Sequence, residues 1–426
     1  MTQLDDRRQD ADERWPGLFT APSGPRTRVS AAVTRRLFDA VARRFDLCVV
    51  TKDPPSATPR PTIVLHRPQE FYARIGRDGL IGFGEGYLTG AWDSPDLPRL
   101  LTVLAAEIGT LVPARLQRLR GWYTDRMPHH HRNSVDNSRA NIAHHYDLSN
   151  ELFATFLDET MTYSSALFDT SVSGPSLAQV AAAPDHQRPE DLADAQRRKI
   201  DRLLDVTGVG PGTRLLEIGT GWGELALRAA VRGARVHSVT LSREQQTLAR
   251  ARIAAAGLAD RVEVELVDYR LVEGEYDAVC SVEMIEAVGH EYLSEYFRTL
   301  RRRLAPGGRA GIQAILMPHD RMLATLGTYT WIHKYIFPGG FLPSAELVEA
   351  LVREAGLTPT DRLSFGLHYA ETLQRWDEAF VDADTAALGF DETFRRMWHF
   401  YLTYCRAGFA SGYLDVQQLV LTTEAR

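Results

Sequence analysis

The feature that most constrains the fold is an alternation of short apolar segments and helical segments between residues 192 and 316. Short strands separated by helices of roughly ten to fifteen residues are typical of βαβ units around a parallel sheet. In such a sheet ligands bind beyond the carboxyl ends of the strands, so we expect an α/β domain with its chemistry at those ends. The periodicity predicts helices at residues 195–206, 224–232, 243–256 and 292–304, strands at residues 214–218, 235–240, 262–267, 276–282 and 310–316, and a turn at residues 306–308.

The first predicted strand runs into a glycine-rich turn that opens a helix. The sequence LLEIGTGWG at residues 215–223 places Glu217 just before three glycines. Glycines accept positive φ and let the backbone approach a ligand, and the free N–H groups of the following helix point into such a turn. We therefore interpret this segment as a turn that binds a nucleotide-containing cofactor.

The residues at the next strand ends decide between cofactors. A dinucleotide-binding fold usually carries an acidic residue at the end of the second strand, where it holds the ribose hydroxyls. Here the acid ends the first strand and the second strand ends in Thr240 and Leu241, which favours S-adenosylmethionine (SAM) over NAD. After the third strand, Asp268 can take the adenine amino group and Tyr269 can cover a ring face.

Length and composition predict a protein of two domains that binds neither nucleic acid nor metal. The chain has 426 residues, of which 24% are charged, and a net charge of -6, whereas nucleic-acid-binding domains are usually basic. Its three cysteines form no CxxC pair, so we expect neither a disulfide framework nor a zinc site. No apolar run reaches the roughly 18 residues that span a bilayer, and no signal segment begins the chain, so we expect a cytoplasmic protein.

Polarity and composition divide the chain into four predicted regions. They are a loose leader at residues 1–28, an α+β domain at 29–112, a basic linker at 113–140 and an α/β domain at 141–426. The linker is either a solvated connector or a surface that meets anionic phospholipid headgroups. A second glycine-rich segment, residues 79–87, leads into no long helix, and we predict a turn between short strands there.

Seven segments, in the same order, resemble those of the cyclopropane-fatty-acid synthase family. They are HYDLSN (145–150), FLDETMTYS (156–164), the glycine turn, TLSREQ (240–245), EMIEAVG (283–289), FPGG (337–340) and HYAETL (368–373). The resemblance covers residues from about 140 to the C-terminus, and residues 79–92 resemble the accessory domain of the longer bacterial members. Residues 317–319 and 331–336 are most similar to the actinobacterial branch that methylates oleoyl phospholipids toward tuberculostearic (10-methylstearic) acid.

The resemblance implies a class I methyltransferase, which has a Rossmann-like doubly wound sheet, with a smaller N-terminal α+β domain and SAM as the methyl donor. The implied cofactor-binding residues are Tyr163, Ser164, Glu217, Gly219, Gly221, Trp222, Gly223, Thr240, Leu241, Gln245, Asp268 and Tyr269. In this family the double bond of an acyl chain attacks the SAM methyl group, which leaves a carbocation on the chain. Aromatic residues that match the family pocket, where they would attract this cation, are Tyr146, Tyr163, Phe337 and Tyr369.

A proton must then leave the transferred methyl group, and the family is thought to use bound bicarbonate as the base. The residues implied to hold bicarbonate are Ser165, Glu286, Gln313, Ile315 and Tyr369, which together with Tyr146 are the catalytic candidates. Two of them depart from the family pattern, because Ser165 replaces a cysteine and Gln313 replaces a histidine, although both keep hydrogen-bonding groups. The base is therefore either bicarbonate or Glu286, whose pKa should rise near an apolar chain.

The product follows from where the base removes its proton. Proton loss with ring closure gives a cyclopropane, whereas a hydride shift followed by proton loss gives a 10-methylene chain, which a reductase partner would convert into a 10-methyl branch. The departures at residues 165 and 313, with the branch resemblance, favour the methylene product. The alternatives are a cyclopropane-fatty-acyl-phospholipid synthase and, from another class, a catalytically silent lipid-binding protein.

The resemblance also sets expectations about partners. We expect phospholipid acyl chains as the substrate, peripheral association with the inner face of the cell membrane, and a homo-oligomer. The N-terminal domain is expected to serve either acyl-chain delivery or dimerisation, and nothing in the sequence decides between these two roles.

Overall fold

The computed structural model describes residues 14–51, 59–107, 149–169 and 190–423. The chain divides into two compact units. The first comprises Met1–Asp125, Tyr329–Trp331 and Thr385–Ala407, and the second comprises Arg126–Thr328, Ile332–Asp384 and Gly408–Arg426. The predicted basic linker at residues 113–140 lies outside the described residues, so its boundaries stay a prediction.

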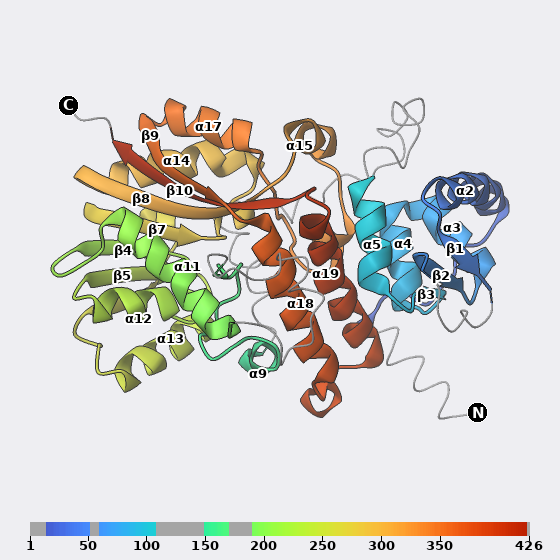
Figure 1. Ribbon diagram of the computed structural model, residues 1–426, viewed down its shortest axis with the longest axis horizontal. Coiled ribbons are helices and arrows are strands. Elements are labelled where there is room, and N and C mark those ends of the chain that lie inside the picture. The colour runs from blue at the N-terminus through green and yellow to red at the C-terminus, as the bar shows by residue number, and fades with distance from the viewer. Residues whose placement is uncertain (1–13, 52–58, 108–148, 170–189, 424–426) are drawn as a thin grey trace. The chain divides into compact units, whose positions relative to one another are not determined.

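The second unit is built on a seven-stranded sheet with the order β6-β5-β4-β7-β8-β10-β9 (Figure 1). Its strands are β4 (Arg214–Ile218), β5 (Arg235–Thr240), β6 (Val262–Leu266), β7 (Tyr276–Val282), β8 (Leu304–Leu316), β9 (Leu357–Ser364) and β10 (Asp415–Thr423). Strands β6, β5, β4, β7 and β8 are parallel to one another, whereas β10 is antiparallel to both β8 and β9. This arrangement confirms the expected α/β class with a doubly wound sheet.

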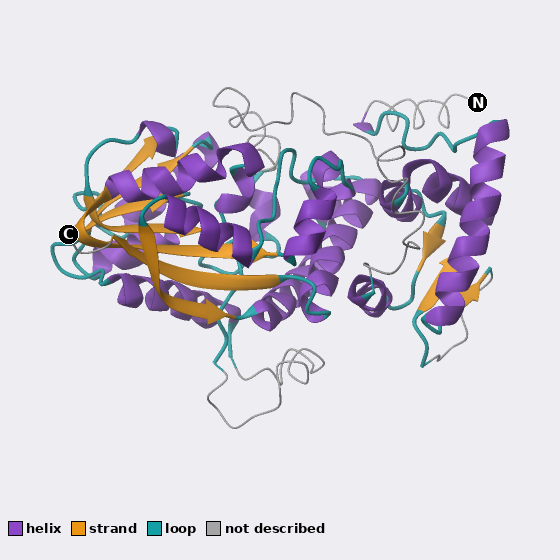
Figure 2. Cartoon of the chain, turned by 90° about the horizontal axis from the view of Figure 1, so that it is seen from above, coloured by secondary structure: helices purple, strands orange, loops and turns teal. Residues whose placement is uncertain are grey.

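Helices cover both faces of this sheet, whose strands fan out with a twist in Figure 2. Helices α11 (Leu192–Thr207), α12 (Glu224–Val231) and α13 (Arg243–Ala255) pack on one face, and α14 (Leu293–Arg303) and α17 (Ala345–Glu354) on the other. Alternate residues of β4 enter the two cores, because Leu215 packs with the first group of helices and Leu216 with the second. The remaining helices from residue 149 onward are α9 (Asn150–Ala154), η3 (Tyr269–Leu271), η4 (Ile285–Ala287), η5 (His290–Tyr292), α15 (His319–Thr325), α16 (Trp331–Tyr335), α18 (Gly366–Asp382), η6 (Thr385–Leu388) and α19 (Glu392–Ala410).

The predicted elements of the sheet domain match the observed ones closely, with one exception. Strands β4, β5 and β7 have the predicted bounds, and each predicted helix ends within three residues of the observed one. The exception is β8, which begins at Leu304 and runs across the turn predicted at residues 306–308. Here the pairing with β7 passes from Leu304 to Arg309 while β7 advances only from Tyr276 to Ala278, and Gly307 has a φ of 76°. The Pro-Gly-Gly sequence therefore does turn the chain, but within the strand and not before it.

The first unit combines helices with a three-stranded sheet of order β1-β2-β3. Its elements before residue 108 are α2 (Pro25–Arg44), β1 (Cys48–Val50), β2 (Thr62–Leu65), α3 (Pro68–Asp78), α4 (Leu80–Leu88), β3 (Trp92–Asp93) and α5 (Leu97–Ala106). Strand β1 is parallel to β2, and β3 is antiparallel to β2. The unit therefore has the α+β composition that the sequence predicts.

The second glycine-rich segment is a helix, α4, and the predicted turn between strands is wrong. A Cβ atom added at Gly82 would lie 2.1 Å from the carbonyl oxygen of Arg74, and one at Gly84 would lie 2.5 Å from the indole of Trp331. A Cβ atom at Gly86 would lie 3.0 Å from Trp92. These glycines let neighbouring backbone and indole rings approach the helix, which is a packing role that the local sequence does not reveal.

The predicted loose leader is wrong for residues 14–28, and residues 1–13 lie outside the described part of the chain. Leu18 is only 4% exposed, and its carbonyl oxygen accepts a hydrogen bond of 2.6 Å from Arg74. The indole of Trp15 donates to Asp391 at 2.9 Å, and helix α2 already begins at Pro25. Two apolar anchors among charged residues therefore suffice to fix this segment. Within the described residues no helix is long and apolar enough to cross a membrane.

Candidate active site

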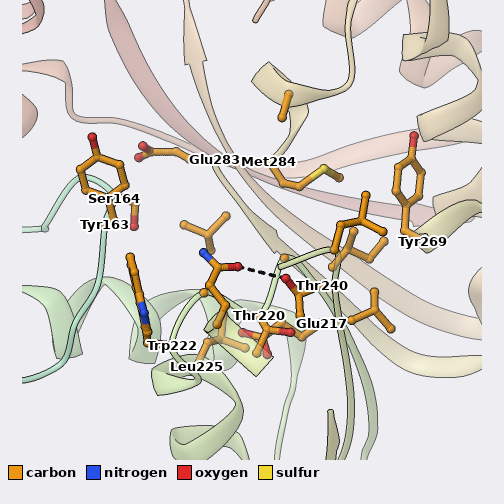
Figure 3. A pocket seen from close by; sticks show the side chains of 18 of the residues that line it. Tyr163, Ser164, Glu217, Thr220, Trp222, Leu225, Thr240, Tyr269, Glu283 and Met284 are labelled. Atoms are coloured by element: carbon orange, nitrogen blue, oxygen red, sulfur yellow. Dashed lines mark hydrogen bonds between the residues drawn. The ribbon is translucent and has the colours of Figure 1, made fainter. Parts of the chain in front are cut away.

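A pocket of about 170 Å³ opens at the carboxyl ends of β4, β5, β6 and β7. Eleven of the twelve residues expected to bind the cofactor line it, and Gly223 is the exception. In Figure 3 Tyr163, Trp222 and Glu283 lie at one end of the pocket and Tyr269 at the other, with Thr240 and Glu217 between them. The parallel sheet therefore gathers these residues where an α/β fold places its ligands.

The glycine turn has the backbone geometry that glycine makes accessible. Gly219, Gly221 and Gly223 have φ values of 96°, 52° and 92°. A Cβ atom at Gly223 would lie 3.1 Å from the Cβ atom of Ala249, so this glycine also lets α12 pack against α13. The first two glycines line the pocket and the third fixes the helix behind it.

Glu217 is a buried carboxyl group at the end of β4. Its side chain accepts a hydrogen bond from the hydroxyl of Ser238, and only 3% of the residue is exposed. Burial raises the pKa of Glu217 to about 8, and the Ser238 hydrogen bond only partly opposes this shift. A buried carboxyl group of this kind suits a cationic ligand, and SAM carries both an ammonium and a sulfonium group.

Beside Glu217, the ends of β5 and β6 present groups that suit the adenosine portion of SAM. The hydroxyl of Thr240 donates to Oε1 of Gln245 at 3.0 Å (Figure 3), which leaves the amide hydrogens of Gln245 for a ligand. Asp268 is 6% exposed and accepts hydrogen bonds of 2.8 and 2.5 Å from the guanidinium of Arg270. Tyr269 lines the pocket directly after Asp268. The residues at this end therefore fit the cofactor that the sequence predicts.

The side chains of Trp222, a predicted cofactor-binding residue, and Arg252, which was not predicted, tie the segment before Tyr163 to the glycine turn. The indole of Trp222 donates to Oδ1 of Asn150 at 2.7 Å. Arg252 on α13 donates to the carbonyl oxygens of Trp222 and Thr160, at 2.8 and 3.0 Å. Asn150 lies in a family-like segment, but nothing local marks Arg252, because its acceptors, among them the two carbonyl oxygens and the carboxylate of Glu224, come from distant parts of the chain.

The residue at the centre of the other end is Glu283, which the sequence analysis did not single out. Its Oε1 accepts hydrogen bonds from the backbone N–H of Ser165 at 2.9 Å and from Nε2 of Gln313 at 2.8 Å. Its Oε2 accepts from the hydroxyl of Tyr369 at 2.6 Å. Three of the predicted catalytic residues therefore converge on one carboxylate, whose position directly after β7 was the available sequence signal.

Glu286 lies beside this group and makes a different set of contacts. Its Oε1 accepts a hydrogen bond of 2.5 Å from the backbone N–H of Ile315. Its Oε2 is buried and has no hydrogen-bond partner among the described residues. Burial, followed by the negative charge of Glu283, raises the pKa of Glu286 to about 8. Burial and the neighbouring charge therefore both favour the protonated form of Glu286.

The donors expected to hold bicarbonate are already used within the protein. Ser165 contributes its backbone N–H, because its hydroxyl donates to the carbonyl of Ala166 at 3.1 Å. The amide of Gln313 donates to Glu283 and, at 3.4 Å, to the carbonyl of Ser165. With the Tyr369 hydroxyl also engaged, these three residues have no donor left for a second anion. The arrangement does not fit a bound bicarbonate ion.

A buried lysine, Lys199, completes the pocket and was not predicted. Its Nζ donates to the hydroxyl of Ser164 at 2.6 Å, and the residue is fully buried. Burial lowers the pKa of Lys199 to about 8, although the charge of Glu283 opposes this shift. The spacing of Lys199 four residues after Ala195 and four before Leu203 places it on the buried face of α11, which was a signal in the sequence.

The remaining aromatic candidates differ in position. Tyr163 lines the pocket, and its ring centroid lies 5.2 Å from those of Phe153 and Trp376. Phe337 is not among the residues that line the pocket. Tyr146 lies outside the described residues, so its role stays a prediction. In the described part of the chain, no group of three or more His, Cys, Asp or Glu side chains is arranged to hold a metal ion.

Comparison with known proteins places this site in a family. Residues 133–419 match the family described as mycolic acid cyclopropane synthetase. The chain is 52% identical to the tuberculostearic acid methyltransferase UfaA1 of Mycobacterium tuberculosis over 97% of this chain and 96% of that protein. It is 30% identical to the cyclopropane-fatty-acyl-phospholipid synthase of Escherichia coli over 83% of this chain and 86% of that protein.

A solved structure of a relative agrees with this result. The mycolic acid cyclopropane synthase CmaA1, in a complex with SAH and CTAB, matches with a TM-score of 0.58 and 30% identity. The match covers 69% of this chain and 98% of the relative. Both the family match and the pocket geometry agree with the resemblance read from the sequence. The chain therefore belongs to the mycolic acid cyclopropane synthetase family and is a SAM-dependent methyltransferase of that family.

Proposed function

We propose that this enzyme methylates the double bond of oleoyl chains in phospholipids and releases a 10-methylene acyl chain, the precursor of 10-methylstearate. The observation that carries this proposal is the 52% identity to a tuberculostearic acid methyltransferase, which extends over nearly the full length of both proteins. The glutamine at position 313, where cyclopropane-forming members usually have a histidine, supports a product other than a ring.

The walls of the pocket suit an apolar substrate. Val282, Met284 and Val288 line the same cavity as Glu283, so a hydrocarbon chain would meet apolar side chains there. Bound SAM supplies an electrophilic methyl group. Because an alkene is a weak nucleophile, the residues of this chain must hold the two reactants in line and exclude water.

Aromatic rings and a buried carboxylate suit the charge that develops on the acyl chain. Tyr163 lines the pocket, and Tyr369 reaches Glu283, with its ring centroid 4.5 Å from that of Phe409. The faces of such rings attract a cation. Removal of a proton from the transferred methyl group after a hydride shift gives the methylene, whereas removal with ring closure gives a cyclopropane.

The test uses dioleoyl phospholipid vesicles and methyl-labelled SAM. We expect label in the acyl chain, a mass gain of one CH₂ group and vinylidene protons in the NMR spectrum. High-field ring protons would instead identify a cyclopropane synthase. Absence of label in the lipid would contradict the substrate class, and cofactor binding without any methyl transfer would favour a catalytically silent lipid-binding protein.

The enzyme is further proposed to act in the cytoplasm, as a peripheral protein on the inner face of the cell membrane. The arginine-rich residues 113–140 support contact with anionic headgroups, because basic segments are attracted to such a surface. Binding to vesicles that contain anionic phospholipid should weaken as salt is raised, because salt screens this attraction. If binding to the vesicles does not depend on salt, residues 113–140 are only a connector between the domains.

Two partners complete the proposal. Conversion of the methylene into a methyl branch requires two electrons and two protons, so a separate reductase is proposed to consume the product. A homo-oligomer is also proposed, with the N-terminal domain serving dimerisation or acyl-chain delivery. Light scattering of the full-length protein over a range of concentrations would test the homo-oligomer.

A further inference from the structure

We propose that Glu283 occupies the place of a bound anion in this site and is itself the base that removes the proton from the transferred methyl group. The inference deepens the proposed function and rests on it. With Glu283 as the base, the reaction needs no bicarbonate, and Glu286 does not remove the proton.

The hydrogen bonds of Glu283 leave it one site for an incoming proton. A carboxylate offers about four lone-pair positions. Two on Oε1 accept from Ser165 and Gln313, and one on Oε2 accepts from Tyr369. The remaining lone pair of Oε2 is on a side chain that lines the pocket, whereas Glu286 does not line it. Of these two neighbouring glutamates, Glu283 is therefore the one with access to the pocket.

The backbone at Glu283 is strained in a way that serves the site. Its φ is 47°, a left-handed value that non-glycine residues adopt rarely and at a cost in energy. Among the described residues only Asp46, Met161 and Glu283 combine a side chain with positive φ, and two of these three line the pocket. Such strain concentrates at functional sites, where the surrounding structure maintains it.

A chain of hydrogen bonds fixes which end of the Gln313 amide faces Glu283. Arg202 can only donate, and it donates to Oε1 of Gln418 at 2.7 Å. The amide nitrogen of Gln418 must then point the other way, and it donates to Oε1 of Gln313 at 3.1 Å. Nε2 of Gln313 is thereby directed at Glu283. The guanidinium of Arg202 therefore sets the orientation of the Gln313 amide through Gln418.

The charges around the pocket also favour one carboxylate and no further anion. Burial raises the pKa of Glu283, and the charge of the buried Lys199, followed by the hydrogen bonds from Tyr369, Ser165 and Gln313, opposes this rise. Burial and the negative charge of Glu283 raise the pKa of Glu286, and no cation among the described residues opposes this rise. A bicarbonate ion would add a second negative charge beside Glu283, which is unfavourable in a buried site.

The step balances without a co-reactant. A C–H bond of the transferred methyl group breaks, and its electron pair becomes the second bond of the exocyclic methylene. The proton joins the carboxylate of Glu283, and the cationic carbon becomes neutral as the double bond forms. Glu283 then returns the proton to water when the product leaves.

The test compares Glu283→Gly with Glu283→Gln. Glycine tolerates the left-handed backbone at this position and empties the space among the three donors, so small carboxylates can enter. We expect Glu283→Gly to lose at least about a thousandfold in turnover, within the range of general-base removal, and to recover at least about tenfold with sodium formate or bicarbonate. Glu283→Gln fills the space and should show no recovery.

The wild-type enzyme supplies the second arm. Its turnover should be unchanged in buffer freed of carbon dioxide, and ¹³C-labelled bicarbonate should show line broadening with Glu283→Gly but not with the wild type. Wild-type turnover that requires bicarbonate, wild-type binding of bicarbonate, or full activity of Glu283→Gln would overturn the assignment. Thermal unfolding of each variant checks that the fold is retained.

These arms separate failure of the inference from failure of the proposed function. If the wild type methylates dioleoyl lipid but depends on bicarbonate, the function stands and the base is not Glu283. If the wild type transfers no methyl group to this lipid, the proposed substrate is wrong, and the bicarbonate-binding comparison still decides whether Glu283 fills the anion site.

Discussion

The two ends of the pocket, one at the glycine turn after β4 and one at Glu283, are formed by different kinds of groups. The end that receives the methyl donor rests on the turn after β4, where three glycines and the N-terminus of α12 supply backbone geometry. The other end is assembled from separate parts of the chain: the backbone N–H of Ser165 in the loop before Ala166, and side chains from the end of β7, strand β8 and helix α18. Only this second, carboxylate end carries the proposed base, so we expect changes there to alter turnover and changes at the first, donor end to alter the affinity for SAM.

The largest expected effect separates the two carboxylates of that second end. Glu283→Gln should lower turnover by at least about a thousandfold, because it removes the proposed base. Glu286→Gln should lower it by only about tenfold, because a glutamine resembles the protonated form that the raised pKa of about 8 favours. Steady-state kinetics with labelled SAM measure both. Calorimetric titration should give SAM affinities within about threefold of the wild type, since neither change touches the donor end.

Equal losses in the two variants would contradict this division of roles. A larger loss in Glu286→Gln than in Glu283→Gln would instead make Glu286 the base, which is one of the two bases left open from the sequence.

The second expected effect tests the network that orients Gln313. Gln418→Glu keeps an acceptor for Arg202 but offers Gln313 only oxygen atoms, so the Gln313 amide should turn and present its own oxygen to Glu283. We expect turnover to fall by about a hundredfold, with the affinity for SAM unchanged. Because a donor to the carboxylate is lost, the pKa of Glu283 should rise and the acid limb of the pH–rate profile should move to higher pH.

Gln418→Met serves as the control, because it removes the network without forcing the amide to turn. It should lose less activity than Gln418→Glu. The same pH profile in both variants and the wild type would show that Gln418 has only a structural role.

The third expected effect lies at the donor end and concerns the affinity for SAM. The pKa of Glu217 is raised to about 8, so at pH 6 a cationic ligand must displace its proton. We expect SAM affinity to rise by about tenfold between pH 6 and pH 7.5, and Glu217→Gln to abolish this rise. Calorimetry in buffers of different ionisation enthalpy would detect the released proton. A pH-independent affinity in the wild type would place the cationic groups of SAM elsewhere.

The same carboxyl group makes a prediction about stability. A folded-state pKa of about 8 exceeds the ordinary value of 4.5, so the contribution of Glu217 to stability is fully present below pH 4.5 and is lost as pH rises through 8. Glu217→Gln should therefore gain stability relative to the wild type as pH increases from 5 to 8. Thermal unfolding at these two pH values measures the difference.

The contrast between the two ends also explains what the sequence could predict. The glycine turn, Thr240 and Asp268 follow strands whose bounds were read from local periodicity, and they meet because parallel strands end at one edge. The catalytic candidates were known only through resemblance, and the group on which they converge, Glu283, was overlooked. Its role depends on donors 118 and 30 residues away along the chain.

The two glycine-rich segments also show that local sequence does not determine structure without tertiary contacts. Residues 79–87 and 217–223 have similar composition, but the first forms helix α4 and the second forms a turn. The difference lies in partners such as Trp331, which contacts the position of Gly84 from more than 200 residues away. Local propensity does not contain that information, because helix α4 is stabilised by close packing that only tertiary structure supplies.

The smallest expected effect tests which atoms of Ser165 matter. Its hydroxyl donates to the neighbouring carbonyl of Ala166, and Glu283 accepts from its backbone N–H. Ser165→Ala keeps that N–H and should reduce turnover by less than about threefold, and Ser165→Cys, which restores the residue usual in cyclopropane-forming members, should behave alike. The serine at position 165 was a reason to doubt that the site binds bicarbonate. The hydrogen bond from the backbone N–H of Ser165 to Glu283, however, does not depend on the side chain at this position. A loss greater than about tenfold in Ser165→Ala would show that the hydroxyl turns toward Glu283 during the reaction, and the carboxylate end would then depend on side chains at every contact.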